Sequence, residues 1–109
     1  MNVRLYVLQR LTATAMVPLI AIHLATMIYA IRGGLTATEI LSRTRGSVGW
    51  ALFYGLFIML AAVHGAIGVR GVLREWSRLD ARALDLVMWG VGLILVLLGL
   101  RAVAAVVLP

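Results

Sequence analysis

His64 is the side chain of this sequence best suited to bind a metal or move a proton, because it lies where an imidazole cannot be hydrated. It belongs to the run GSVGWALFYGLFIMLAAVHGAIGV, residues 46–69, which contains no Asp, Glu, Lys or Arg. A run of this length spans the roughly 30 Å hydrocarbon core of a bilayer, where an ionisable side chain needs a partner. The second histidine, His23, lies in another apolar run, residues 11–31. Both histidines are therefore candidate ligands inside a membrane.

Glycines follow His64 on its own face of the predicted helix. Gly68 and Gly71 stand four and seven residues later, so they remove side chains from the surface beside the imidazole. Bare backbone permits either close packing of a neighbouring helix or contact with a flat macrocycle whose iron the imidazole ligates. Arg70 stands six residues after His64, about 9 Å further along the axis, where a haem propionate would need a partner. The combination favours haem ligation by His64 over packing alone.

His23 has fewer suggestive neighbours. Its face carries Ala15, Leu19 and Met27, an ordinary apolar set with which ligation and packing are equally compatible. Counted from the same edge of the bilayer, His64 lies about six residues deep and His23 about thirteen, which predicts a difference in height of about 10 Å. We therefore do not expect the two imidazoles to ligate one haem within one chain. Each needs a second ligand from elsewhere.

The composition places these residues in a membrane protein without a separate soluble domain. Of the 109 residues 63% are hydrophobic and only 13% are charged, whereas soluble domains average about 25% charged residues. The absence of cysteine excludes disulfides, thiolate catalysis and iron–sulfur clusters within this chain. The net charge of +6 comes from arginines at the edges of the apolar runs, where lipid headgroups and topology require them. We therefore expect the lipid bilayer, and no nucleic acid, as a partner.

The apolar runs predict an all-α fold of three transmembrane helices in a single domain, residues 1–109. The spans are expected at about residues 11–31, 46–69 and 86–108. Pro18 should kink or loosen the first span, because it removes a backbone donor. Between the first two spans, Thr36 or Thr38 is expected to cap a short surface helix around Glu39.

The distribution of arginine predicts the orientation. Six arginines lie on the side shared by the N-terminus and the second connection: Arg4, Arg10, Arg70, Arg74, Arg78 and Arg82. The first connection holds three: Arg32, Arg43 and Arg45. Because positively charged connections stay in the cytoplasm, we expect a cytoplasmic N-terminus and an outer C-terminus. The use of arginine without lysine suggests a bacterium with a GC-rich genome, and hence the bacterial inner membrane.

Three segments together resemble the small cytochrome b membrane anchors of succinate dehydrogenase and fumarate reductase. They are QRLTATAMVPLIAIHL in the first span, HGAIGVRGVLREW at the end of the second, and the glycine-containing third span. The resemblance covers nearly the whole chain. It implies a haem-binding helical bundle that is completed by a second anchor subunit or a symmetry mate. It also implies flavoprotein and iron–sulfur subunits as partners.

The resemblance further implies roles for individual residues. His64 matches the span-two histidine that ligates haem b, and His23 matches the first-helix histidine that serves an outer haem in two-haem members. Arg10 matches the basic residue at the start of the first helix. Glu75 and Trp76 stand where the family has an acid–aromatic pair, often Asp-Tyr, at the quinone pocket. An indole donates one hydrogen bond but is not a phenolic proton donor, so this pair departs from the family pattern.

A quinone site at the cytoplasmic edge of the second span is therefore expected, with Arg10, Arg70, Glu75 and Trp76 as its residues. An interfacial pocket with a few donors and an aromatic wall suits a quinone head. The alternative for Glu75 is an ion pair with Arg78 or Arg82 on a solvated face: the two are equally compatible with the sequence.

Two other functions have to be weighed against this one. A small non-redox membrane anchor or assembly protein, whose histidines only pack, would have the same composition. A small proton-coupled pump normally needs an intramembrane carboxylate, and here Asp85 lies only at the edge of the third run. We therefore expect a haem b-binding subunit, not catalytic alone, that passes electrons between an iron–sulfur subunit and membrane quinone.

Overall fold

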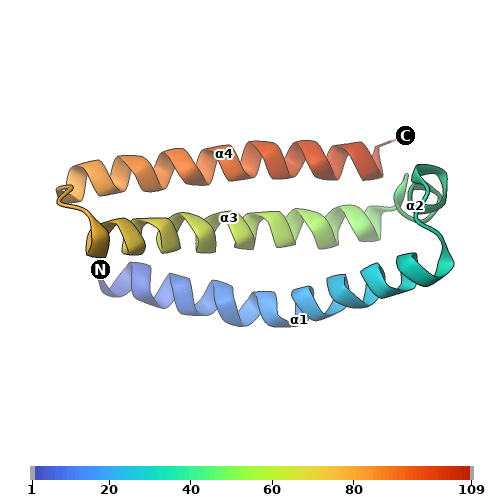
Figure 1. Cartoon of the computed structure of the whole chain (residues 1–109), viewed down its shortest axis with the longest axis horizontal. Helices are drawn as coiled ribbons and strands as arrows, with labels where there is room; N and C mark the ends of the chain where they lie inside the picture. The colour runs from blue at the N-terminus through green and yellow to red at the C-terminus, as the bar shows by residue number, and fades with distance from the viewer. Residues whose placement is uncertain (1, 109) are drawn as a thin grey trace.

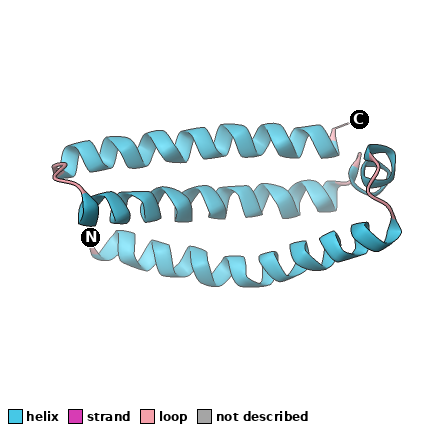
Figure 2. Ribbon diagram, in the orientation of Figure 1, coloured by secondary structure: helices cyan, strands magenta, loops and turns pink. Residues whose placement is uncertain are grey.

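The computed structural model describes residues 2–108, so the first and last residues of the predicted 1–109 domain lie outside the described residues. Over these residues the chain forms four α-helices and no strand (Figures 1 and 2). The helices are α1 (Val3–Gly33), α2 (Ala37–Thr44), α3 (Val48–Trp76) and α4 (Ala81–Val107). The helices α1, α3 and α4 are long and apolar enough to cross a membrane. The predicted all-α, three-span membrane architecture is confirmed to that extent.

The three long helices extend beyond most of the limits expected from the apolar runs. They contain 31, 29 and 27 residues, which at 1.5 Å per residue is about 40–47 Å. This exceeds the roughly 30 Å of the hydrocarbon core. The additional turns carry most of the arginines, because a helix can continue into the headgroup region while its charged side chains stay in water. The apolar runs therefore mark the hydrocarbon-spanning part of each helix and not its ends.

Each helix begins at a polar residue whose side-chain oxygen accepts a backbone N–H of the first turn. Asn2, Ser47 and Asp80 do so for α1, α3 and α4, at 2.9, 3.2 and 2.8 Å. Thr36 caps α2 and forms a reciprocal capping box with Glu39, which confirms one of the two caps expected from the sequence. The hydrogen bonds from the hydroxyl and the backbone N–H of Thr36 hold the pKa of Glu39 below its ordinary value.

Pro18 lies inside α1, and the helix continues through it to Gly33. The ribbon of α1 bows near its middle, so its two halves point in different directions (Figure 1). A bend of this kind follows from the missing N–H of proline and from the contact of its ring with the preceding turn. After Gly33 the chain turns at Gly34, whose φ of 129° is a conformation that favours glycine.

Helix α3 lies between α1 and α4 and contacts both (Figure 1). Small residues bring α3 and α4 together: a Cβ on Gly92 would lie 3.4 Å from Ala66, and one on Gly65 would lie 3.3 Å from Leu95. Gly99 is tighter still, because its Cβ would overlap the side chain of Ile58. Close approach through small residues is the usual way in which helices pack in lipid, where apolar burial does not drive association.

The far end of α4 is held by the segment that joins α2 to α3. The hydroxyl of Thr44 donates to the carbonyl of Val106, and the backbone N–H of Gly46 donates to the carbonyl of Val107, both at 2.6 Å. These carbonyls belong to the last turn of α4 and have no partner within their own helix. The short helix α2 is thereby fixed over the C-terminal end of α4.

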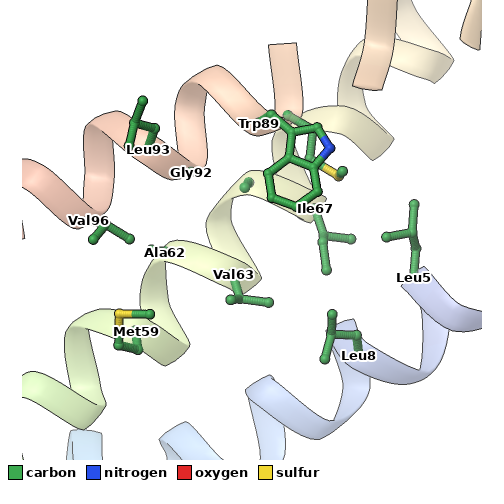
Figure 3. A pocket seen from close by; sticks show the side chains of 12 residues that line it. Leu5, Leu8, Met59, Ala62, Val63, Ile67, Trp89, Gly92, Leu93 and Val96 are labelled. Atoms are coloured by element: carbon green, nitrogen blue, oxygen red, sulfur yellow. The ribbon is translucent and has the colours of Figure 1, made fainter. Parts of the chain in front are cut away.

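An apolar groove of about 400 Å³ opens between the three long helices (Figure 3). Leu5 and Leu8 line it from α1, Ala62 and Ile67 from α3, and Trp89 from α4, among others. None of its lining residues is charged, and neither histidine reaches it. The groove therefore lies apart from the residues that the sequence singled out.

The close α3–α4 contact generates a prediction. Gly99→Ala should weaken the packing of α4 on α3, at a cost of about 1–3 kcal/mol in the free energy of unfolding, because the new Cβ has no space beside Ile58. Gly90→Ala is the matched control, since a Cβ there meets nothing within 4 Å. Both changes raise helix propensity equally. Thermal unfolding of the two variants in detergent, followed by circular dichroism, should show a lower Tm for Gly99→Ala alone; equal Tm values would contradict the packing described.

Candidate functional site

The imidazole of His64 is held between α3 and the N-terminal half of α1. Its Nδ1 lies 3.3 Å from the hydroxyl oxygen of Thr12 and 3.3 Å from the backbone carbonyl of Gln9. Thr12 is itself buried, and its hydroxyl lies 2.8 Å from the carbonyl of Leu8. The histidine that the sequence places within the bilayer thus finds polar partners on the neighbouring helix.

These partners determine which nitrogen of His64 carries the proton. A carbonyl can only accept, so the Nδ1 that faces Gln9 must donate. The single hydrogen of the Thr12 hydroxyl is used on the Leu8 carbonyl, so its oxygen also accepts from Nδ1. Nε2 therefore carries the lone pair in the neutral imidazole, and it forms no hydrogen bond with residues 2–108. A ring nitrogen whose counterpart donates to a carbonyl is the usual form of a histidine ligand.

Gly68 lies one turn beyond His64 and faces α1 as well. A Cβ at this position would stand 3.5 Å from the side-chain nitrogen of Gln9. This is an ordinary van der Waals distance, and the Gln9 side chain lies over the glycine on the surface of α3. The amide oxygen of Gln9 is buried and has no hydrogen-bond partner among the described residues. Gln9 therefore adds an unsatisfied polar atom beside the imidazole.

Arg70 does not share the surroundings of His64. It is 8% exposed, and its Nε donates to the Asp85 carboxylate of α4 at 2.8 Å. This is the one ion pair formed within residues 2–108. The two terminal nitrogens of Arg70 form no hydrogen bond with the same residues. The guanidinium thus uses one edge on Asp85 and retains donors for a further anion.

His23 lies in an aromatic environment on the other half of the bundle. Its ring stands edge-to-face against Tyr54 and Phe57 of α3, with centroids 5.8 and 5.6 Å away. The Tyr54 hydroxyl is 3.5 Å from Nδ1 of His23. Trp50 stacks on Tyr54 at a centroid distance of 5.6 Å. His23 is thereby oriented by aromatic side chains that the sequence did not single out.

His23 also lines a cavity of about 830 Å³ between α1, α2 and α3, hereafter the His23 cavity. Most of its walls are apolar, and its polar groups come from His23, Thr26, Tyr29, Arg43, Thr44 and Tyr54. A mainly apolar cavity with a few convergent polar groups is the usual form of a small-molecule site. Arg43 brings a cation to His23 from α2, where the face of α1 alone had offered none.

The two histidines lie at different heights along α3. His64 belongs to α3, whereas His23 packs against Phe57 and Tyr54, which stand seven and ten residues before His64 on the same helix. Seven to ten residues correspond to about 10–15 Å along the helix axis. The two imidazoles are therefore at separate levels of the bundle.

The residues expected at a quinone site are not gathered into a pocket within one chain. Arg10 is exposed, and its guanidinium lies 5.9 Å from the ring of Tyr6 on its own helix. Glu75 is exposed, and Trp76 is 84% exposed at the end of α3. None of these residues lines the apolar groove or the His23 cavity. A site built from them would need walls from another chain.

The donor set of the chain fits haem better than a bare metal ion. Among residues 2–108 there is no group of three or more His, Asp or Glu side chains that could hold a metal ion. Haem brings its own four equatorial nitrogens and needs the protein only for axial ligands. His64 could offer one ring nitrogen to a haem iron, and a second protein ligand at this level would need another chain.

Comparison with protein-family models, curated proteins and solved structures finds no match to this chain.

The Arg70–Asp85 pair generates a prediction. Asp85→Asn should lower the free energy of unfolding by about 1.5–3 kcal/mol, because it removes a charge-assisted hydrogen bond and leaves a buried guanidinium without a counter-charge. Glu75→Gln removes a carboxylate that is exposed and forms no ion pair within residues 2–108, so it serves as the control. Thermal unfolding in detergent measures both. Equal stability of Asp85→Asn and the unmodified protein would show that the pair does not hold α3 to α4.

Proposed function

We propose that this chain is a haem b-binding membrane anchor of a succinate dehydrogenase or fumarate reductase complex, in which electrons pass between an iron–sulfur subunit and membrane quinone. The observation that carries the proposal is the geometry of His64. Its Nδ1 donates to the Gln9 carbonyl and the Thr12 hydroxyl, which leaves Nε2 as the ligating nitrogen. The apolar, multi-pass character of the chain and its resemblance to such anchors support the same function.

His64 would hold the haem iron axially, and bound haem b supplies one-electron redox chemistry at its iron. Gln9 and Thr12 orient the imidazole through their contacts with Nδ1. The terminal nitrogens of Arg70 are donors that a propionate can accept from, while Asp85 holds the guanidinium in place. His23 is the candidate ligand of a second, outer haem.

The second axial ligand at each level would come from another anchor chain or from a symmetry mate of this one. A height difference of about 10–15 Å would prevent His23 and His64 of one chain from serving a single iron. A two-fold axis would bring each histidine to its own counterpart. The iron–sulfur clusters would belong to a soluble partner subunit, because this chain has no cysteine to ligate them. The flavin would belong to the flavoprotein subunit that the resemblance implies.

The proposed location is the bacterial inner membrane with the N-terminus in the cytoplasm. This orientation follows from the larger number of arginines on the side of the N-terminus and the α3–α4 connection. The soluble subunits would dock on that side. The quinone site proposed there comprises Arg10, Arg70, Glu75 and Trp76, with walls supplied by the docked subunits.

A non-redox anchor is the second candidate, and one observation favours it. Both histidines have a partner across the α1–α3 interface, at 3.3 and 3.5 Å, which is what packing residues also require. The two candidates differ in a single measurable property, the haem content of the assembled complex.

His64→Ala tests the main proposal in the purified membrane complex. The variant should lose the haem held at this level, and with it the corresponding α-band of the reduced-minus-oxidised spectrum, because the other histidine of this chain, His23, lies at a different level. Thr12→Val is the companion variant, since it removes one acceptor from Nδ1 while keeping the shape of the side chain. It should retain haem with a shifted midpoint potential. Full haem content and an unchanged spectrum in His64→Ala would refute ligation by His64.

Glu75→Gln and Trp76→Leu test the quinone site. Each should lower the rate of quinone reduction and weaken inhibition by quinone analogues several-fold, without loss of haem, because both residues are exposed and support no packing within residues 2–108. Arg78→Gln is the control, as an exposed charge on the same connection. Unchanged rates and inhibitor sensitivity in both variants would place the quinone site in another subunit.

A further inference from the structure

Arg43 lines the His23 cavity as a cation that forms no ion pair within residues 2–108, although its charge acts on Glu39 one turn earlier. Its Nη2 donates to the carbonyl of Gly34 at 3.2 Å, and its guanidinium lies 5.2 Å from the centre of the Tyr29 ring. Arg70–Asp85 is the one ion pair within residues 2–108. Glu39 lies one turn before Arg43, but its carboxylate accepts from the hydroxyl and the N–H of Thr36. Arg43 is therefore fixed in position while donors remain for an anion.

The position of Arg43 repeats an arrangement found at the other histidine. Arg70 stands six residues beyond His64 along α3. Tyr29, over which Arg43 lies, stands six residues beyond His23 along α1. Six residues correspond to about 9 Å along a helix in each case. Because α1 and α3 run in opposite directions (Figure 1), each arginine lies between its histidine and the nearer end of the bundle.

We propose that Arg43 is the carboxylate-binding residue of the His23 cavity, and that the cavity takes an amphipathic ring ligand which His23 binds at its centre and Arg43 binds at its acidic edge. This inference rests on the proposed function and extends it, since haem b is such a ligand and its propionates would point to α2. A guanidinium binds carboxylates with paired hydrogen bonds, and the surrounding apolar walls strengthen that attraction. Helix α2 is held over the end of α4 by Thr44 and Gly46. It would thereby fix the position of the Arg43 guanidinium in the cavity.

A phosphate of a lipid headgroup is the other source of an anion at this level of the membrane. It shares the chemistry of the propionate, since both accept paired hydrogen bonds from a guanidinium. The two sources of the anion differ in their effect on the haem midpoint potential. A propionate couples the charge of Arg43 to the potential of an iron, whereas a lipid phosphate does not.

The test uses the purified complex with its native haem and compares Arg43→Gln, Arg43→Lys and Arg45→Gln. Arg45 lies two residues further on, is exposed and does not line the cavity, so it is the matched control. Loss of the charge beside one haem should favour its oxidised form about tenfold, a fall of about 59 mV in the midpoint potential of that haem. In Arg43→Lys the midpoint potential of that haem should fall by much less than in Arg43→Gln, because the positive charge is kept. Arg45→Gln should leave this midpoint potential unchanged. The potential of the haem at His64 should stay constant in all three variants.

The outcomes separate the inference from the function on which it rests. A complex without haem overturns both. A haem at His64 together with unaltered spectra and potentials in Arg43→Gln overturns the inference and leaves the function of His64 standing. Loss of bound anionic lipid in Arg43→Gln, measured by mass spectrometry, with no change in any haem potential would assign Arg43 to a headgroup and also overturn it. The inference is supported if Arg43→Gln lowers the midpoint potential of one haem alone, and if that haem is the one lost in His23→Ala.

Discussion

The polar contacts between α1 and α3 are the constraint on which the arrangement of this protein depends. Each histidine lies in a segment where water does not reach, so its ring must find donors or acceptors on a neighbouring helix. His64 finds them in Gln9 and Thr12, and His23 finds one in Tyr54. These contacts occur at two levels and fix both the rotation of α1 about its axis and its register along α3. A shift by one residue would turn both imidazoles away from their partners.

Helix α4 is held by a different kind of interaction. Its contacts with α3 come from small residues such as Gly92 and Gly99, which allow the two backbones to approach. Within residues 2–108 its polar side-chain and backbone contacts with other elements lie at its ends, through Asp85 at one and through Val106 and Val107 at the other. The contacts of both histidines therefore lie on the α1 side of α3, whereas the small-residue packing and the Arg70–Asp85 pair lie on its α4 side.

The number and type of the helices could be predicted from the apolar runs, because helices are the only open structures whose backbone is satisfied in lipid. The partners of His23, His64 and Arg70 could not be predicted in the same way. Nothing near His23 in the sequence points to Arg43, which reaches the same cavity from a separate short helix. Arg70 was expected near a propionate, but its bond to Asp85 depends on the turn that brings α4 back along α3. Gln9 could not be predicted as a partner of His64, because the contact is made by its backbone carbonyl and depends on how α1 packs against α3.

The bow in α1 has a mechanical consequence. Helices α3 and α4 are joined along their length and at both ends, so they form a stiff unit, whereas α1 is a bent rod with Pro18 near its centre. His64 is held by the half of α1 that precedes Pro18, and His23 lies in the half that follows it. Because Pro18 removes one backbone hydrogen bond, the two halves of α1 can move against α3 separately. The contacts of His64 with Gln9 and Thr12 can therefore change while that of His23 with Tyr54 is kept.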